Sequence, residues 1–521
     1  CAQFVKRAFP EIKVTMGGGF ANTELRSLKD VRVFQYFDFI TLDDGELPIE
    51  QLYQYINGKI KIENLKRTYT LINEEIAYIN TTECKDYKQA QVGTPDYTGL
   101  LLDQYIQAIE IVNPMHSLWS NGRWNKLTMA HGCYWGKCTF CDVTLDYIKL
   151  YEPINASIIC DRIEELIKNT GETGFHFVDE AAPPSLMGAL AIEIIRRKLK
   201  ISWWTNIRFE KAFTKDLCML LRESGCIGVS GGLEVASDRL LILINKGITV
   251  EQVARVNQHF TEAGIMVHAY LMYGFPTQTA QETIDSLEMV RQMFKAGILK
   301  SAFWHLFTMT AHSPVGLEPE KFKVKKAKEV EIKFADNDVE HIDETGTDHL
   351  SFSYGLKKSL FNYMQEVGLE EPLHKWFEMK IPKTTIDPDY IERILSSEII
   401  RSYKPTTQII YIGTNPGRNA AATSSRAQHA PMGIPLPSAL ASATFTTRSL
   451  NEFVGLSVSF LTHTSPSPSS AARRSARTSG VKPAPRSMAG WSSEGSRSAY
   501  RQMFAGPAAI RSREVWLRIA S

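Results

Sequence analysis

The sequence predicts an α/β protein built around a partial (β/α) barrel of six strand–helix units over about residues 126–310. Two observations predict this fold. Short apolar and aromatic runs alternate with amphipathic stretches long enough for helices of about 10–15 residues, which is the pattern of a parallel sheet. Polar residues and glycines follow these runs where each strand ends, as they do at the working face of such barrels.

The six expected strands are short and mostly apolar: residues 126–130, 175–179, 201–207, 227–234, 266–274 and 301–307. Helices are expected from about Asn155, over 185–199, from Thr214 to Gly225, and after the capping pairs Thr249/Gln252 and Thr279/Glu282. A Thr followed three residues later by Glu or Gln marks a helix start because the two side chains can bond each other's backbone amides. Six units are too few for an eight-fold barrel, so we expect a partial one.

The composition argues against a membrane protein and favours a reducing compartment, the cytoplasm. The chain has 521 residues and 44% hydrophobic content, enough for several domains. No apolar run approaches the ~18 residues of a membrane span, and there is no signal peptide. Cys84, Cys160, Cys218 and Cys226 lack the spacing of a disulfide framework. The chain opens on Cys1 in a helix-like segment, and we expect further sequence upstream of it.

The net charge of +2 is unevenly distributed. Residues 416–521 contain 12 Arg and one Lys against three Glu, a net charge of +10, which leaves −8 for the rest of the chain. That acidic remainder argues against a large nucleic-acid footprint. From about residue 415 the sequence is rich in Ser, Ala, Arg and Pro, a composition that buries little apolar surface. We expect residues 415–521 to be a disordered or non-native tail; a functional basic arm is the alternative.

Polar residues and glycines gather at the expected strand ends. They are Asp179 and Glu180 after the second strand, Arg208 after the third, Glu234 at the end of the fourth, Gly274 and Pro276 after the fifth, and His305 in the sixth. Each has an ordinary structural explanation as a solvated carboxylate, an ion pair, a helix cap or a turn. Because the carboxyl ends of parallel strands meet at one rim, their coincidence favours a site there.

Three of the eight cysteines lie within nine residues, in the stretch "HGCYWGKCTFCDV" after the first strand. Cys133, Cys138 and Cys141 are soft ligands suited to zinc or to an iron–sulfur cluster. A structural zinc site takes four ligands, usually in two separated pairs, and no second pair follows here. His131 is only two residues from Cys133. A three-cysteine iron–sulfur cluster is the favoured interpretation, with zinc or a chance grouping of buried thiols as alternatives.

This motif resembles that of the radical S-adenosylmethionine (SAM) superfamily, over about residues 1–345. The superfamily has three residues between its first two cysteines, whereas four lie here, from Tyr134 to Lys137. The resemblance implies that Phe140, Asp179, Glu180, Arg208, Glu234 and Gly274 bind SAM. Tyr134 and Trp135 would shield the cluster or pack the barrel mouth.

The first 60 residues resemble the second half of the Rossmann-like cobalamin-binding domain found in the cobalamin-dependent branch of this superfamily. The resemblance rests on "IKVTMGGGFANTEL" and "DFITLDDGELPIEQLYQYI". It implies cobalamin near Gly17, Gly18 and Gly19, where glycines allow close backbone approach. We expect this chain to bind cobalamin weakly or not at all without the other, N-terminal half of the domain.

The resemblance also implies the activity. A [4Fe–4S] cluster with one open iron would bind SAM, and reductive cleavage would give a 5′-deoxyadenosyl radical that takes a hydrogen atom from an unknown substrate, a small molecule or peptide. Cobalamin-dependent methylation is one outcome, and an electron donor such as flavodoxin or ferredoxin is required. The alternatives are a methylthiotransferase-like RNA-modifying enzyme and a non-catalytic iron–sulfur or zinc protein.

The expected domain order follows from these assignments. Residues 1–60 form the half-domain, 61–125 a linker, and 126–345 the barrel. Residues 346–414 form a helical cap over the barrel mouth, or alternatively a packing element, and 415–521 the tail.

Overall fold

The computed structural model describes residues 1–104, 113, 115, 118, 124–327, 337–397, 408–409 and 458–459. The chain divides into two compact units, Cys1–Ser402 and Tyr403–Ser521. In the second unit the described residues are two short parallel strands, β17 (Gln408–Ile409) and β18 (Val458–Ser459), so the predicted tail lies almost wholly outside the described residues. Among the described residues, none of the helices has the length and apolar content needed to cross a membrane.

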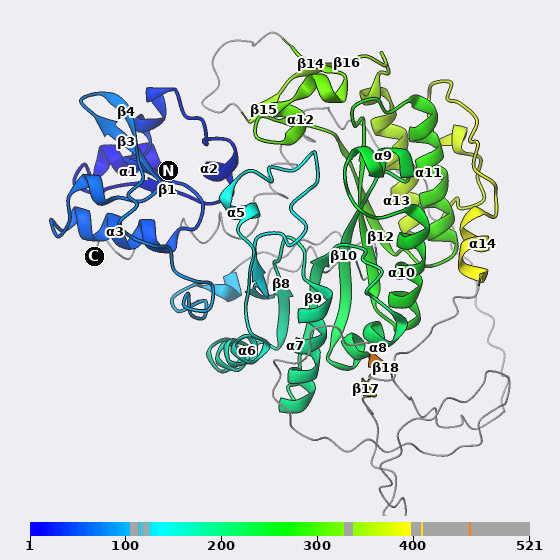
Figure 1. Ribbon diagram of the computed structural model, residues 1–521, viewed down its shortest axis with the longest axis horizontal. Helices are drawn as coiled ribbons and strands as arrows, with labels where there is room; N and C mark the ends of the chain where they lie inside the picture. Colours follow the sequence, from blue (N-terminus) through cyan, green and yellow to red (C-terminus); the bar gives the residue numbers. More distant parts are fainter. Residues whose placement is uncertain are drawn as a thin grey trace, which may run out of the picture. The chain divides into compact units, whose positions relative to one another are not determined.

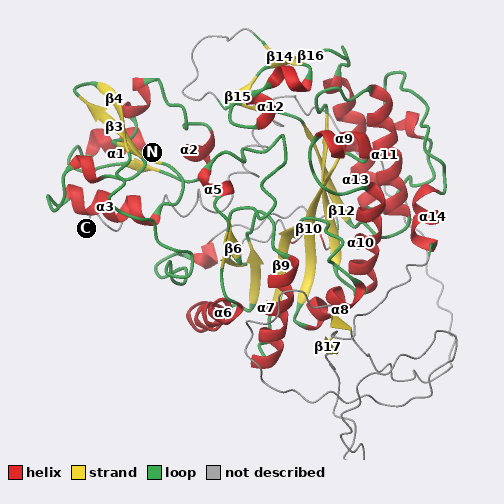
Figure 2. Cartoon of the chain, in the orientation of Figure 1, coloured by secondary structure: helices red, strands yellow, loops and turns green. Residues whose placement is uncertain are grey.

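The first unit is built around a six-stranded parallel sheet, the main sheet (Figure 2). Its strands are β5 (Asn125–Leu127), β8 (Gly174–Phe177), β9 (Ser202–Ile207), β10 (Cys226–Glu234), β11 (Met266–Tyr273) and β12 (Ser301–Leu306). They pair in sequence order from β5 to β12, and within the described residues no pairing joins β12 back to β5. The predicted strands and the predicted partial barrel are confirmed. Both faces of β10 and β11 are buried, as parallel strands require.

Helices follow the strands and pack beside the sheet (Figure 1). They are α6 (Ala156–Thr170), α7 (Pro184–Arg197), α8 (Lys215–Glu223), α9 (Asp238–Leu243), α10 (Val250–Glu262) and α11 (Ala280–Lys295). The capping box predicted at Thr279 and Glu282 is present, and the Thr249 hydroxyl accepts from the Gln252 amide. Local capping therefore places the helix starts close to the predicted positions.

The N-terminal sheet is mixed rather than purely parallel. It contains β1 (Thr15–Met16), β2 (Phe39–Thr41), β3 (Thr68–Ile72) and β4 (Glu75–Ile79), with α1 (Ala2–Ala8), α2 (Gly19–Thr23) and α3 (Glu46–Ile56). The first two strands are parallel, and β3 and β4 add an antiparallel hairpin. The sheet thus continues to Ile79, beyond the predicted end at residue 60. The hairpin turns at Asn73 and Glu74, both at positive φ, which suits a tight two-residue turn.

Residues 346–397 pack mainly along the side of the barrel. Helix α13 (Ser353–Met364) contacts edge strand β12 and α11, and α14 (Tyr390–Ser396) contacts α10 and α11. This differs from the predicted cap over the mouth because β12 is an open edge, and a helix laid along it covers strand surface that would otherwise be exposed. Residues 398–407 and 410–414 of that predicted segment lie outside the described residues.

The remaining elements are short. They are β6 (Ala130–His131), α5 (Asp146–Lys149), β7 (Glu152–Pro153), β13 (Met309–Thr310), α12 (Pro314–Leu317), β14 (Val324–Lys326), β15 (Asp338–Val339) and β16 (His341–Asp343), with 3-10 helices at Val31–Gln35, Ile62–Asn64, Leu102–Gln104, Pro319–Phe322, His349–Phe352 and Leu373–Trp376.

Candidate functional site

The three clustered cysteines lie on one loop, residues 132–151, which we call the cysteine loop. Strands β6 and β7 pair antiparallel and close its base. Directly after β6, Gly132 has φ +68°, and a Cβ there would lie 2.3 Å from the Leu150 carbonyl oxygen. Only glycine fits this position. The next residue, Cys133, donates its amide to the Ile148 carbonyl at 2.9 Å, so the first predicted ligand is held by backbone contacts.

Cys133, Cys138 and Cys141 are free thiols, with Cys138 buried and the other two half-buried. Burial, followed by the charges of Glu180 and Cys138, raises the pKa of Cys141 well above its ordinary value. Among the described residues, no three His, Cys, Asp or Glu side chains converge on a single ion position. A cluster offers a separate iron to each thiolate, so its ligands surround a space rather than meet at a point. The soft, enclosed thiols fit such a cluster.

Arg208 holds the middle of the cysteine loop. Its Nη1 lies 3.9 Å from the Cys138 sulfur, and its guanidinium stacks on Trp135 with 4.3 Å to the ring centroid. The side chain is buried and pairs with Glu210 at 2.9 Å, so the ion pair that was the ordinary alternative for this residue is present, but in the interior. The indole of Trp135 also donates to the Asn245 carbonyl at 2.9 Å. Arg208 thus contacts the cysteine loop at Cys138 and Trp135, and its other hydrogen bonds go to Glu210 and to the Lys246 carbonyl.

Glu234 ends β10 and forms a buried ion pair that the sequence did not predict. Its Oε1 accepts from Lys246 Nζ at 2.6 Å, and Lys246 also lies 5.6 Å from the Phe140 ring centroid. Burial opposes the charge of Lys246, but the Glu234 carboxylate and then the Cys138 thiol raise its pKa. A Cβ on Gly232 would lie 2.0 Å from Glu234 Oε1, so this glycine makes room for the pair. The predicted site residues Phe140 and Glu234 thus meet around Lys246.

Asp179 and Glu180 are neighbours in sequence with different surroundings. The buried Asp179 carboxylate accepts from the amides of Met129 and Ala130, at 2.8–3.0 Å, just before the cysteine loop. Burial raises the pKa of Asp179 to about 7, while these hydrogen bonds act in the opposite direction. Asp179 therefore supports the base of the loop, and it is not the solvated carboxylate that was the ordinary alternative.

Glu180, by contrast, is exposed to water. Many protein atoms nevertheless lie around its carboxylate, and they lower its solvation. Burial raises the pKa of Glu180, and the charge of His131 opposes that shift. The Glu180 charge also acts on Cys141 and on Tyr270. The carboxylate of Glu180 is thus accessible and lies near the thiols.

Gly274 lies at the same rim, after β11, with φ +78°. A Cβ there would lie 2.9 Å from Leu306 and 3.2 Å from His349, so the 3-10 helix before α13 does reach the rim at this point. His305 in β12 is half-buried, and burial lowers its pKa to about 4.

The glycines Gly17, Gly18 and Gly19 lie apart from this rim, in the N-terminal sheet. They connect β1 to α2, with Gly18 at φ +88°. A Cβ on Gly17 would lie 2.7 Å from the Thr41 hydroxyl, so this turn packs closely against the end of β2. The carboxyl ends of two parallel strands meet here, as the resemblance requires.

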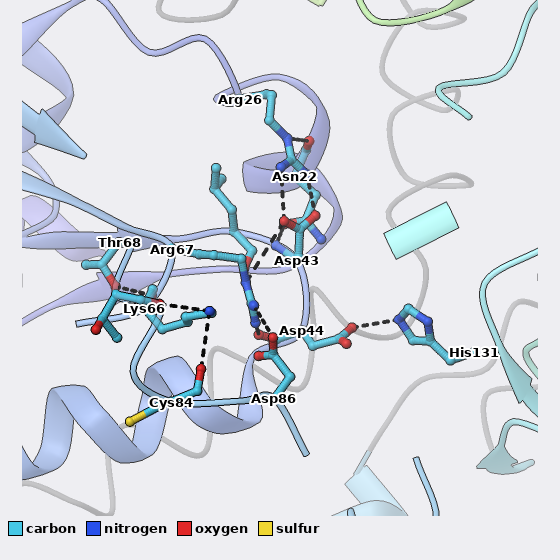
Figure 3. A network of polar contacts seen from close by, with 12 residues as sticks. Asn22, Arg26, Asp43, Asp44, Lys66, Arg67, Thr68, Cys84, Asp86 and His131 are labelled. Atoms are coloured by element: carbon cyan, nitrogen blue, oxygen red, sulfur yellow. Dashed lines mark hydrogen bonds and ion pairs between the residues drawn. The ribbon is translucent and has the colours of Figure 1, made fainter. Parts of the chain in front are cut away.

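A network of polar side chains follows the end of β2 and reaches the cysteine loop (Figure 3). Asp43 pairs with Arg26 at 2.5 Å, and its amide donates to Asn22. Asp44 accepts from His131 at 2.8 Å. The pKa of His131 is raised to about 9, chiefly by its hydrogen bond to Asp44. Sequence reasoning noted both segments but had no signal that they meet.

Comparison with known proteins identifies the barrel. Residues 127–290 match the radical SAM superfamily. This segment is a radical SAM domain. The match confirms the predicted superfamily for this segment. The cysteine loop lies inside the matched segment, and it contains all three cysteines, with four residues between Cys133 and Cys138.

Two curated proteins are similar in sequence to this chain. An anaerobic magnesium-protoporphyrin IX monomethyl ester cyclase of Rubrivivax gelatinosus is 30% identical over 203 residues, 38% of this chain and 34% of that protein. An uncharacterized methyltransferase of Pyrococcus horikoshii is 25% identical over 296 residues, 56% of this chain and 60% of that protein. The chain therefore spans less than two thirds of either relative.

Among solved structures, the cobalamin-dependent S-adenosylmethionine radical enzyme OxsB, determined with aqua-cobalamin bound, is similar to this chain with a TM-score of 0.51. The two are 12% identical, and the similarity covers 66% of this chain and 55% of OxsB. At this identity the likeness concerns the fold, and it agrees with the α/β architecture predicted from the sequence.

Proposed function

We propose that this protein is a radical SAM enzyme in which Cys133, Cys138 and Cys141 hold a [4Fe–4S] cluster. The observation that carries the proposal is the placement of three soft thiols on one braced loop, at the carboxyl ends of the parallel strands of a radical SAM domain. When bound, the cluster would supply the electron that cleaves SAM, and the resulting radical would start chemistry on the substrate. The chain's own residues would bind and orient the cluster, SAM and the substrate, and would exclude water from the site.

The contacts of each site residue support a proposed role for it. Glu180, with an accessible carboxylate beside Cys141, is the residue that we propose binds the SAM amino group. Phe140 and Gly274 are proposed to line the adenine. The carboxylate of Asp179 and the guanidinium of Arg208 already have protein partners, so we propose that these two residues position the cysteine loop. Glu234 is proposed to act on SAM only together with Lys246.

We further propose that the turn at Gly17–Gly19 and the end of β2 contact cobalamin, and that the reaction is a cobalamin-dependent methylation or a related rearrangement. The parallel arrangement of β1 and β2 supports this, because ligands bind where the carboxyl ends of such strands meet. We propose a small molecule or peptide as substrate, a small electron-transfer protein of the flavodoxin or ferredoxin kind as electron donor, and the cytoplasm as location.

Anaerobic reconstitution with iron and sulfide tests the cluster. The protein should take up about four irons per chain and show a reduced-state electron paramagnetic resonance (EPR) signal that SAM perturbs. Reduction in the presence of SAM should release 5′-deoxyadenosine. Single changes Cys133→Ala, Cys138→Ala and Cys141→Ala should each abolish the cluster and the product.

The matched control is Cys160→Ala, which removes a buried thiol from α6 and should leave both cluster and product in place. The same is expected of Cys218→Ala and Cys226→Ala. A purified protein with one zinc and no iron, or a full cluster in Cys133→Ala, would refute the proposed function.

A further inference from the structure

Asp44, in the turn after β2, forms an ion pair with His131, the last residue of β6 and the residue directly before the cysteine loop (Figure 3). His131 Nε2 lies 2.8 Å from Asp44 Oδ1, and Nδ1 lies 2.7 Å from the Leu150 carbonyl oxygen. Both partners are acceptors, so both ring nitrogens donate and the imidazole carries a positive charge. With both nitrogens engaged, His131 is a structural contact rather than a fourth ligand of the cluster.

On the N-terminal side, the segment that carries Asp44 is firmly held. Arg67 donates from Nε to the Leu42 carbonyl at 3.1 Å and from Nη2 to the Asp44 carbonyl at 2.9 Å. Asp43, at φ +58°, is fixed by Arg26 through two hydrogen bonds. Charge-assisted bonds of this kind are stronger and more directional than neutral ones. The Asp44 carboxylate is therefore presented from a rigid turn at the end of β2.

On the barrel side, His131 is the last residue of β6. Only Gly132 separates it from Cys133, and the ring is bonded to Leu150, which lies at the other end of the cysteine loop. The side chain of His131 thus ties both ends of the loop together and to Asp44. A displacement of Asp44 would move His131, and because only Gly132 lies between them, it would also move Cys133, the first predicted cluster ligand.

We propose that Asp44 is a positioning residue that holds Cys133 in place from the N-terminal sheet, so that the ligand-binding end of β2 and the cysteine loop are mechanically coupled. The role of this coupling rests on the proposed function, because it would let a ligand bound at the end of β2 affect the cluster. The coupling itself can be tested without the cluster, because the contacts exist in the metal-free chain.

The first test uses the metal-free full chain under anaerobic, reducing conditions. The rate of alkylation of Cys133 by iodoacetamide is measured by mass spectrometry for Asp44→Ala and for the matched control Asp86→Ala. Asp86 also belongs to the network, where it pairs with Arg67 at 2.7 Å, but within the described part of the chain its side chain forms no hydrogen bond or ion pair with the barrel.

Loss of this partly exposed, charge-assisted pair should increase the population of loop conformations that expose Cys133 by about tenfold. We expect Cys133 to react about tenfold faster in Asp44→Ala and less than about twofold faster in Asp86→Ala, with Cys160 unchanged in both. Asp44→Asn keeps an acceptor for His131 and should be intermediate, at about threefold, which separates a lost contact from a general loss of fold.

Equal alkylation of Cys133 in Asp44→Ala, Asp44→Asn and Asp86→Ala would overturn the proposal. In the reconstituted enzyme, Asp44→Ala should retain about four irons per chain, as the three thiols remain, but shift the EPR signal of the reduced cluster. If the unmodified protein takes up no iron and cleaves no SAM, the proposed function fails, while the alkylation comparison still decides whether Asp44 positions the loop.

Discussion

The ion pair between Glu234 and Lys246 makes a quantitative prediction about stability. The two side chains are only 11% and 8% exposed and lie 2.6 Å apart, so neither charge can turn to water when its partner is removed. Removing one partner of a buried pair typically costs ~3–5 kcal/mol, because the other charge is left uncompensated. We therefore expect Glu234→Gln and Lys246→Met each to lower the free energy of unfolding by about 3–4 kcal/mol.

The double variant distinguishes this account from simple loss of packing. If the two losses were independent, Glu234→Gln with Lys246→Met would lose about 6–8 kcal/mol, comparable to the whole stability of a domain. Because no charge is left buried in the double variant, we expect it to lose less than about 3 kcal/mol. The recovery would be the measure of the pairwise interaction.

Urea unfolding of the metal-free protein at pH 7, followed by circular dichroism, measures these losses. Lys300→Met is the matched control, since Lys300 and Glu366 are exposed and 3.5 Å apart, and its effect should stay below about 0.5 kcal/mol. Losses of under about 1 kcal/mol in the two single variants, or strictly additive losses in the double variant, would refute the reasoning.

Two further predictions concern regions outside the site. Hydrogen bonds from Arg196 and then Arg197 lower the pKa of Glu193 to about 2, so the stability this group contributes is present above its ordinary pKa and is lost as the pH falls towards 2. Glu193→Gln should cost about 1–2 kcal/mol at pH 7, and the difference from the unmodified protein should shrink as the pH falls below the ordinary pKa of Glu and vanish only near pH ~2. Gly225 has φ +96° and a Cβ would lie 2.1 Å from the Ile201 carbonyl oxygen, so Gly225→Ala should cost ~2–4 kcal/mol in thermal unfolding. Gly171→Ala, at φ +74° with open space around it, should cost only ~1 kcal/mol.

The strands and helices of the barrel could be predicted because their signals are local. Buried strands such as β11 consist mostly of apolar and aromatic residues, and helix starts carry their own caps, as at Thr279. The hairpin of β3 and β4 was assigned to a linker although its signal is also local. Two short strands flank Asn73 and Glu74, but Glu is an uncommon residue in a tight turn at positive φ.

The partners of the site residues could not be predicted in the same way. A polar residue at a strand end predicts a position at the rim, but its contacts depend on loops that return from elsewhere. Lys246 reaches Glu234 from the segment after α9, and Trp135 reaches Arg208 from the cysteine loop. The pattern therefore predicted positions at the ends of the strands, but it did not separate Glu180, which has an accessible carboxylate, from Asp179, whose carboxylate accepts backbone hydrogen bonds.

The cysteine loop is supported from three directions, and each support comes from a different part of the chain. Asp179 holds the amides that lead into the loop, Arg208 contacts the sulfur of Cys138, and Asp44 acts through His131 next to Cys133. Two of these supports belong to the barrel itself. The third lies in the N-terminal sheet, so under our proposal the position of Cys133 depends in part on a structure outside the radical SAM domain. A barrel produced without residues 1–60 would keep the first two supports and lose the third. The reactivity of Cys133 is therefore the measure of the contact between the N-terminal sheet and the cysteine loop.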